Sequence, residues 1–231
     1  MSVLYKVKVV FSKCGDDLNE HGFATSEINF PSAWDHIAIS YKAIEIVKDA
    51  DVFFYGSLAC RNDVSKQSLF SILDSNDHMF KVFDVNLRKP FYNIEILGKL
   101  MLKAAFIKFN DEEIMEIALG FEFESLEDNI SVISEKTNTS CICVTLGKHG
   151  SILLWNGHIS EHPGYPLMVV DTVGAGASFL ASLIVDIWSG KDPDHALDFA
   201  SAIGALVAGQ SGANPKIEKA DVEAFIIHKT K

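Results

Sequence analysis

The period of the hydrophobic pattern changes close to residue 31. Apolar and polar side chains alternate over residues 3–11 and 22–30, which predicts two strands, and the polar stretch KCGDD (13–17) predicts the turn between them. After that point, short apolar runs alternate with segments of helical period. The pattern therefore predicts a small β unit over residues 1–30 and a larger α/β unit over residues 31–231.

The larger unit is predicted to alternate strands with helices. Strands are expected at residues 51–57, 81–86, 104–110, 140–147, 151–155 and 167–172. Helices are expected at residues 38–50, 64–76, 93–104, 111–118, 174–188, 193–209 and 220–229. Strands that are separated by helices pair in parallel through right-handed crossovers, so we expect an α/β sandwich. In such folds, ligands bind beyond the carboxyl ends of the strands.

The composition is that of a globular protein with a sizeable core, and its charge argues against some partners. The 231 residues are 48% hydrophobic and 22% charged, and the formal net charge is −11. A field of that sign repels polyanions, so neither a nucleic acid nor an anionic membrane is expected as the main partner. The apolar run at residues 179–188 contains Asp186 and is too short to span a bilayer. Residues 1–11 have no signal-peptide character.

The cysteines favour a reducing compartment. Cys141 and Cys143 lie two positions apart in a strand-like run, so they share one face and form no C-x-x-C pair. The other two are Cys14 and Cys60. We expect buried free thiols rather than a metal site, and therefore a cytoplasmic protein.

The glycine-rich turn in VVDTVGAGASF (169–179) is a candidate anion site. It is no dinucleotide fingerprint, because Phe179 stands where the third glycine would be, and no P-loop, because no Gly-Lys-Ser/Thr follows. Without Cβ atoms at Gly174 and Gly176, a phosphoryl oxygen can approach the amides at a helix start closely. A tight strand-to-helix turn without a ligand explains this stretch equally well.

Three further polar clusters follow predicted strands. They are Asp84, Asn86 and Arg88 in FDVNLR, Asn110 and Glu113 in FNDEE, and Thr145, Gly147 and Gly150 in TLGKHG. Each has a structural explanation: Arg88 as a surface ion-pair partner, Asn110 as a helix N-cap, and the glycines as a hairpin turn. Because all three clusters follow strand ends, their combination with the glycine turn favours a ligand site.

These motifs resemble, in the same order, those of the ribokinase-like carbohydrate kinases, the PfkB family. DTVGAGASF (171–179) is similar to the family's D-T-x-G-A-G-D signature and NDEE (110–113) to N-x-x-E; TLGKHG, FDVNLR and SGANP match as well. PSAWDHI (31–37) and FDVNLR look closest to the fructokinase-like branch. The resemblance implies a three-layer α/β/α sandwich with a mostly parallel sheet over residues 31–231. Residues 1–30 resemble the end of the β-lid that covers the sugar, whose strands often pair between subunits in this family, which implies a homodimer.

The resemblance implies the ATP-dependent phosphorylation of a sugar hydroxyl. The residues that would form the anion hole for the transferring phosphoryl group are Gly174, Ala175 and Gly176. The implied nucleotide site comprises Asn110, Thr145, Gly147, Gly150, Ser201 and Ala202. The groups that would meet sugar or phosphate oxygens are Asp84, Asn86 and Arg88.

The resemblance also implies two kinds of metal ion. Glu113 would reach Mg²⁺ through water. A monovalent cation such as K⁺ would lie between two loops that are far apart in the sequence. Its implied site comprises Asp171, Val173, Val207, Gln210, Gly212 and Lys216.

Two departures from the family bear on activity. The last Asp of the signature, which accepts the proton of the attacking hydroxyl, is replaced by Ala177, and a methyl group accepts no proton. The family's N-terminal strands and sugar motifs have no counterpart before residues 1–30. We therefore expect weak or absent phosphate transfer. The alternatives are a nucleotide-binding protein without kinase activity and an α/β interaction module in which the glycine turn is only structural.

Overall fold

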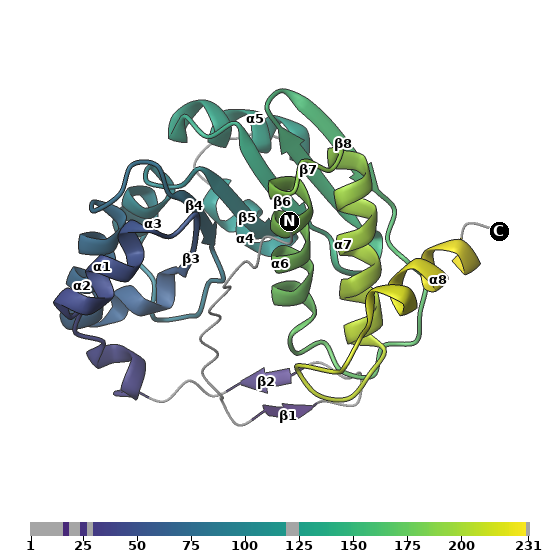
Figure 1. The fold of residues 1–231 in the computed structure, drawn as a ribbon, viewed down its shortest axis with the longest axis horizontal. Helices are drawn as coiled ribbons and strands as arrows, with labels where there is room; N and C mark the ends of the chain where they lie inside the picture. The colour runs from purple at the N-terminus through teal and green to yellow at the C-terminus, as the bar shows by residue number, and fades with distance from the viewer. Residues whose placement is uncertain (1–15, 19–23, 27–29, 119–124, 230–231) are drawn as a thin grey trace.

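The computed structural model describes residues 16–18, 24–26, 30–118 and 125–229. Its centre is a six-stranded sheet in the order β3-β4-β5-β6-β7-β8, with helices on both faces (Figure 1). The strands are β3 (Val52–Gly56), β4 (Phe80–Asp84), β5 (Phe106–Asn110), β6 (Cys141–Thr145), β7 (Ser151–Trp155) and β8 (His158–His162). The predicted α/β class is confirmed, and the strands expected between residues 51 and 155 match β3 to β7 within a few residues.

The direction of the strands sets where a ligand can bind. β3 to β6 pair in parallel, whereas β7 and β8 join the sheet as antiparallel strands. The carboxyl ends of the four parallel strands therefore lie along one edge of the sheet. This edge is where ligands bind in open α/β sheets.

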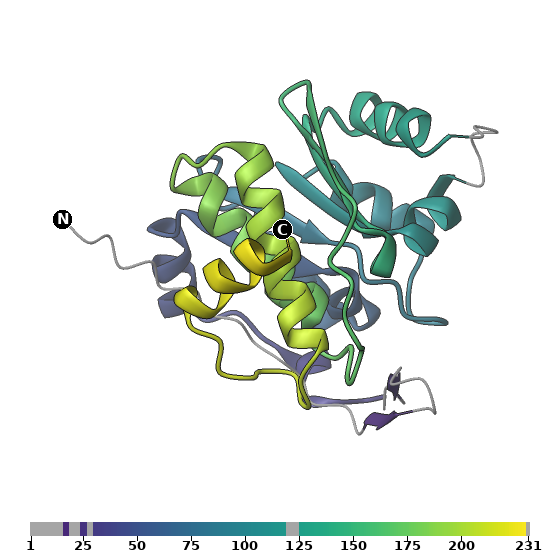
Figure 2. The ribbon, with the colours of Figure 1, turned by 90° about the vertical axis from the view of Figure 1, so that its right-hand side faces the viewer.

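Two hydrophobic cores separate the layers. One face of the sheet packs against α2 (Asp63–Leu73), α3 (Ile94–Met101), α4 (Asp111–Ala118) and α5 (Leu126–Thr137). The other face packs against α6 (Ala175–Trp188) and α7 (Pro193–Ala208), and α8 (Lys219–Lys229) contacts α7. Figure 2 shows α6 and α7 on one side of the sheet and α4 and α5 on the other. Successive residues of a strand, such as Val82 and Phe83, enter opposite cores, as the pleat requires.

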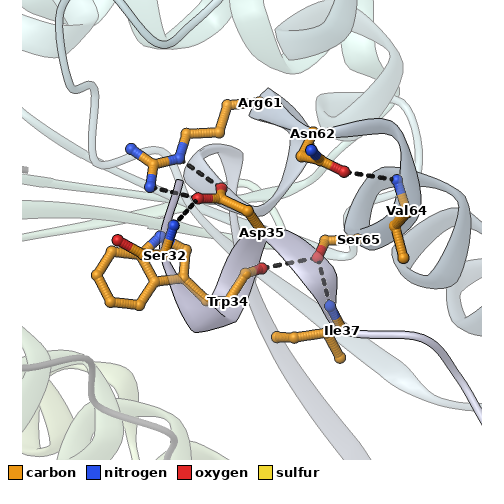
Figure 3. A network of polar contacts seen from close by, with 8 residues as sticks. All are labelled: Ser32, Trp34, Asp35, Ile37, Arg61, Asn62, Val64 and Ser65. Atoms are coloured by element: carbon orange, nitrogen blue, oxygen red, sulfur yellow. Dashed lines mark hydrogen bonds and ion pairs between the residues drawn. The ribbon is translucent and has the colours of Figure 1, made fainter. Parts of the chain in front are cut away.

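The segment before α1 (Tyr41–Lys48) is fastened to the rest of the fold by a buried polar network. Asp35, in the short 3-10 helix η1 (Ala33–His36), is fully buried and pairs with Arg61 at the end of η2 (Ser57–Arg61). Ser65 in α2 hydrogen-bonds to two main-chain groups of this segment, at 2.7 and 2.9 Å (Figure 3). Main-chain groups that no strand or helix uses are thereby satisfied by side chains.

The N-terminal prediction is partly wrong. β1 (Asp16–Leu18) and β2 (Ala24–Ser26) form a separate antiparallel pair. β2 falls inside the predicted strand 22–30, but β1 begins where the turn 13–17 was predicted. The predicted strand at residues 3–11 lies outside the described residues. Pairing of these strands between subunits stays a prediction.

The predicted strand at residues 167–172 is also wrong. Val169 and Val170 are 41% and 46% exposed, and no strand pairs with this segment among the described residues. The N–H groups of Val170 and Asp171 instead donate to the carbonyl of Ala208, at the end of α7, at 2.8 and 3.1 Å. The end of α7 therefore accepts the hydrogen bonds that a neighbouring strand would otherwise have accepted from these two N–H groups.

Within the larger α/β unit, the helix α5 and the strand β8 were not predicted. No helix among the described residues is long and apolar enough to cross a membrane.

Candidate functional site

The candidate site is built at the carboxyl edge of the parallel strands. Asp84 is the last residue of β4, and strand register places it beside Lys108 of β5, which in turn lies beside Cys143 of β6. The side chains of these residues share the face of the sheet that α6 covers, because Val82 and Cys143 belong to the core beneath that helix. The start of α6 lies at the same edge, since a Cβ built on Gly176 would lie 3.8 Å from Nζ of Lys108.

The turn before α6 requires glycine and leaves amides open. Gly174 has φ +84°, and a Cβ at this position would lie 2.1 Å from the carbonyl oxygen of Ala213. The N–H of Ala175 donates to Thr172 at 3.3 Å, whereas no acceptor in the described part of the chain takes the N–H of Gly176 or Ala177. Two open amides at the start of a 14-residue helix favour an anion.

Lys108 places a positive charge beside these amides. Its Nζ lies 3.4 Å from Oδ1 of Asp84 and 3.8 Å from the position of a Cβ built on Gly176. The residue is 8% exposed. Burial by itself would lower the pKa of Lys108, but the carboxylates of Asp84 and Glu113 together raise it above the ordinary value, so the ammonium stays charged. Sequence reasoning missed this residue, although a lysine inside the apolar run FIKFN was a visible signal.

Asn110 and Glu113 form a reciprocal cap at the start of α4. The N–H of Glu113 donates to Oδ1 of Asn110 at 2.7 Å, and the N–H of Asn110 donates to Oε2 of Glu113 at 2.8 Å. Oε1 of Glu113 also accepts the N–H of Leu87 at 3.0 Å. The carboxylate is 4% exposed, and this burial raises its pKa. The structural explanation of Asn110 as an N-cap therefore holds, and Glu113 additionally fixes the loop after β4.

A cavity of about 230 Å³ opens beside this cap. It is lined by Leu87, Arg88, Lys89, Asn110, Glu112, Glu113 and Glu116. Carboxylates next to two cations suit a phosphate chain with its Mg²⁺, because Mg²⁺ is held by one or two carboxylates together with phosphate oxygens. The donor set fits the implied metal.

The side chains of Asp84, Asn86 and Arg88 do not point toward a common site. Asp84 faces Lys108, whereas Asn86 is exposed with φ +42°. Arg88 is exposed, lines the cavity of about 230 Å³, and donates from Nη1 to the carbonyl of Leu87 at 3.0 Å. No acidic partner of Arg88 is found in the described ranges, so the surface ion pair that was the alternative explanation is not formed.

The residues of the implied nucleotide site gather between β6, β7 and α7. Oγ1 of Thr145 donates to the carbonyl of Phe109 at 3.3 Å. A Cβ on Gly150 would lie 1.8 Å from the carbonyl oxygen of His162, so only glycine fits this turn. Ser201 contacts Ser151 at 3.4 Å between hydroxyl oxygens. Gly147 is exposed with φ +56°, while Ala202 is fully buried, so of these two only Gly147 is open to a ligand here.

The two loops of the implied cation site are joined by one carboxylate. Asp171 is 6% exposed; its Oδ1 accepts the N–H of Val173 and its Oδ2 that of Gly212, both at 2.9 Å. Carbonyl oxygens of two loops held in this way suit a monovalent cation. The carbonyl of Val207 accepts the N–H of Gln210 at 3.1 Å.

Lys216 fits that cation site least well. Its side chain is 88% exposed and pairs with Glu218 at 3.0 Å. A protonated amine has no lone pair for a metal ion, so only the main-chain carbonyl could serve.

A second cavity of about 280 Å³ was not predicted. Its lining residues are Ser57, Cys60, Arg61, Pro90, Phe91, Tyr92, Asn93, Ile96 and Leu97. They follow β3 and β4, at the same edge of the sheet. Burial raises the pKa of the Cys60 thiol to about 11, so this cysteine is no nucleophile at neutral pH. Cys60, Cys141 and Cys143 are free, as expected, and Cys14 lies outside the described residues.

The six-stranded sheet with helices on both faces and a candidate anion site at the carboxyl edge define an α/β sandwich in which a ligand is expected at that edge. Residues 25–220 match the family model described as pfkB family carbohydrate kinase. The chain belongs to the PfkB family of carbohydrate kinases.

Individual relatives agree with this membership. Over 185 residues, the chain is 24% identical to fructokinase-1 of Oryza sativa subsp. japonica, a match that covers 75% of this chain and 57% of the rice protein. It is 26% identical over 170 residues to a fructokinase of Klebsiella pneumoniae, covering 68% and 54% respectively. The chain thus spans less than two thirds of the length of these relatives.

Solved structures show the same fold. A fructokinase from Vibrio cholerae O395, in a form bound to fructose, ADP and calcium ion, superposes with a TM-score of 0.74 at 22% identity, covering 91% of this chain and 71% of that one. A fructokinase from Xylella fastidiosa with bound ATP superposes with a TM-score of 0.69 at 19% identity, covering 81% and 64%. The ribokinase-like architecture expected from the motifs is confirmed.

Proposed function

We propose that this chain binds ATP at the start of α6 and carries the nucleotide site of an ATP-dependent sugar kinase of the fructokinase type. The observation that carries the proposal is the pair of open amides at Gly176 and Ala177, with the Lys108 ammonium beside them. Donors directed at an anion in this way are what phosphoryl transfer needs most, because its charge is spread over phosphoryl oxygens. The ATP and fructose held by the fructokinases of like fold support the assignment.

The remaining residues take roles around this point. The base and ribose would lie over the loop at Gly147 and Gly150, next to α7, with the phosphates running toward the start of α6. Glu112 and Glu113 would hold Mg²⁺ in the smaller cavity, through water in the case of Glu113. Asp171 would frame a K⁺ site with the carbonyl groups around it. Mg²⁺, when bound, would neutralise charge on the phosphates.

Ala177 argues for a low rate of transfer. A positioned general base contributes typically about 10²–10⁴-fold to the rate, and the methyl group of Ala177 supplies none. This residue favours a second candidate, a protein that binds nucleotide without transferring phosphate. The free thiols of the described cysteines support a reducing, cytoplasmic setting for either one.

The test is thermal unfolding with and without millimolar ATP and Mg²⁺. A ligand at about 100 times its dissociation constant stabilises the folded state by about 2.7 kcal/mol, which raises the melting temperature clearly. We expect this shift in the chain as given and its loss in Gly176→Asp, because a carboxylate then faces the phosphate. Gly98→Asp in α3 is the matched control, since it adds the same charge where a Cβ meets nothing within 4 Å.

The outcomes separate the classes of function. A nucleotide shift that Gly98→Asp keeps and Gly176→Asp loses supports the site. An unchanged melting temperature of the chain as given contradicts both nucleotide-binding candidates and leaves an α/β interaction module.

A further inference from the structure

The strand β3 leaves one edge of the central sheet open. It is the outer strand next to β4, and β8 is the outer strand at the other end (Figure 1). The N–H of Phe80 donates to the carbonyl of Asp51 at 2.8 Å, so Asp51 and every second residue after it turn their main-chain groups toward β4. The main-chain groups of Val52, Phe54 and Gly56 therefore face away from the sheet, and no described strand pairs with them.

This open edge lacks the features that protect exposed edge strands. Such strands commonly carry charged side chains or proline, which disfavour pairing with another strand. β8, with the sequence HISEH, contains Glu161 and two histidines. β3, with the sequence VFFYG, contains neither a charge nor a proline. The sequence of β3 is therefore typical of a strand that has a neighbour on both sides.

Apolar side chains continue from β3 onto α6. Val52 and Phe54 are only half-buried against the core beneath α6. Phe80, the residue paired with Val52, has its ring centroid 5.5 Å from that of Trp188, which is 39% exposed. Val185, one helical turn earlier, is 37% exposed. Apolar side chains that gather beside an open strand edge mark an interaction surface.

We propose that β3 pairs antiparallel with β3 of a second copy of this chain, about a twofold axis that passes between the two Phe54 residues. The two sheets then become one continuous sheet, and this inference is independent of the proposed function. The axis places Phe54 opposite its own counterpart and Val52 opposite Gly56, as hydrogen-bonded pairs. Each outward N–H and C=O group of β3 thereby gains a partner, and the two Phe54 rings form a cross-strand aromatic pair.

The charges beside β3 favour this partner and this direction. The chain has a net charge of −11, and Asp49 and Asp51 precede β3, so a stable pair of copies must keep these carboxylates apart. With Phe54 on the axis, Asp51 falls opposite Ser57 and Asp49 opposite Ala59. An in-register parallel pair would instead place each Asp51 beside its counterpart.

The oligomeric state of the chain as given is the first test. Sedimentation velocity from micromolar to submillimolar concentration should show a monomer–dimer equilibrium. Val52→Pro removes an outward N–H and keeps the pairing with β4, because proline is tolerated at the first position of an edge strand. We expect its dimer to be about 10- to 100-fold weaker, since each protomer loses one hydrogen bond. Val52→Ala, which shortens the side chain but keeps the N–H, is the matched control and should dimerise more strongly than Val52→Pro.

A charge exchange at Phe54 tests the register. Because Phe54 faces its own counterpart, Phe54→Lys and Phe54→Glu should each be monomeric, since like charges then meet on the axis. A mixture of the two variants should form heterodimers, since opposite charges then meet. Hydrogen exchange of the parent chain needs no variant: the amide of Phe54 should be protected at high concentration and exchange faster on dilution.

The outcomes are distinct. A dimer that Val52→Pro weakens more than Val52→Ala, and that the mixture of Phe54 variants restores, supports the proposal. A chain that stays monomeric, or a dimer that none of these substitutions weakens, overturns it. Weakening without restoration in the mixture overturns the register centred on Phe54. If the variants fail to fold, exchange of the Phe54 amide at a rate that does not depend on concentration overturns the proposal.

Discussion

Asp35 and Arg61 form a two-pronged ion pair that is closed off from solvent. Nε of Arg61 lies 2.5 Å from Oδ1 of Asp35 and Nη2 lies 2.7 Å from Oδ2, and the two side chains are 2% and 0% exposed (Figure 3). The guanidinium also lies 4.7 Å from the ring centroid of Phe91 and 5.0 Å from that of Phe30. The Arg61 guanidinium therefore links the end of η2 to the segment before α1 and to the loop after β4.

Removing one partner of this pair should destabilise the protein strongly. Asp35→Ala removes the carboxylate that accepts two hydrogen bonds from the buried guanidinium, and breaking a buried ion pair in this way costs about 3 kcal/mol or more. Urea unfolding of the variant and the parent chain measures the difference. Asp74→Ala is the control, because its ion pair with Lys103 is about half exposed on both sides, and the change in unfolding free energy should be much smaller. Similar losses of unfolding free energy in both variants would contradict the idea that burial makes the pair of Asp35 and Arg61 more stabilising than an exposed pair.

The same pair should give stability a definite dependence on pH. The hydrogen bond from Arg61 holds the pKa of Asp35 below its ordinary value of 3.8. Because folding lowers the pKa of Asp35, its carboxylate stabilises the folded state at pH values above the unfolded-state pKa. This stabilisation is lost as the pH falls through the folded-state pKa. The stability difference between the parent chain and Asp35→Asn should stay constant from neutral pH to about pH 5 and shrink below about pH 4. A difference that already shrinks at neutral pH would point to another group.

Glycines at the two site turns should not tolerate a side chain. A Cβ on Gly174 would meet the carbonyl of Ala213 at 2.1 Å, and one on Gly150 that of His162 at 1.8 Å, both at positive φ. Each change to alanine should lower the unfolding free energy by more than 1 kcal/mol, roughly the strain of a special backbone position. Gly98→Ala, in a helix with free space around it, should instead stabilise by about 0.5–1 kcal/mol. Thermal unfolding of the three variants measures the change in stability that each one causes. If Gly98→Ala destabilises the protein as much as the other two do, the loss of stability is not specific to the two site turns.

The sequence was sufficient for most of the fold, because buried strands between helices leave short apolar runs such as 81–86 and 104–110. The sequence also contains a signal for β8, which the prediction missed. Asn156 and Gly157 both have positive φ, at 51° and 85°, and join β7 to β8 as a two-residue hairpin. An Asn-Gly pair between apolar runs is a strong hairpin signal. The polar character of residues 158–162 hid the strand.

The candidate site was only half predictable. The glycine turn and the cap at Asn110 and Glu113 are local features, so their spacing shows them. The pairing of Asp84 with Lys108 depends on the register of β4 against β5, which no local pattern encodes. The failed strand at residues 167–172 has the same origin, because apolar residues form a strand only where a neighbouring strand edge accepts them.

The Asp171 carboxylate should couple nucleotide binding to a monovalent cation. Asp171→Ala removes the acceptor for Val173 and Gly212, so the two loops of the proposed cation site lose their link. We expect K⁺ to strengthen nucleotide-dependent stabilisation of the parent chain and to have no such effect in the variant. Melting temperatures in potassium and tetramethylammonium salts at equal ionic strength measure this. Asp186→Ala, which removes a half-buried carboxylate further along α6, is the control; an unchanged potassium effect in Asp171→Ala would argue against the site.

Restoring a proton acceptor at position 177 should raise transfer. Ala177→Asp places a carboxylate in the first turn of α6, where the helix dipole tolerates it, and we expect fructose-dependent ADP release to rise by about 10²–10⁴-fold. Ser178→Asp is the control, because it adds the same charge one position further along, turned by about 100° around the helix. It therefore offers no carboxylate at the position of the family's base. Equal activity in both variants would mean that position 177 does not receive the proton. Silence of Ala177→Asp, with nucleotide binding intact, would place the defect in the binding of the sugar.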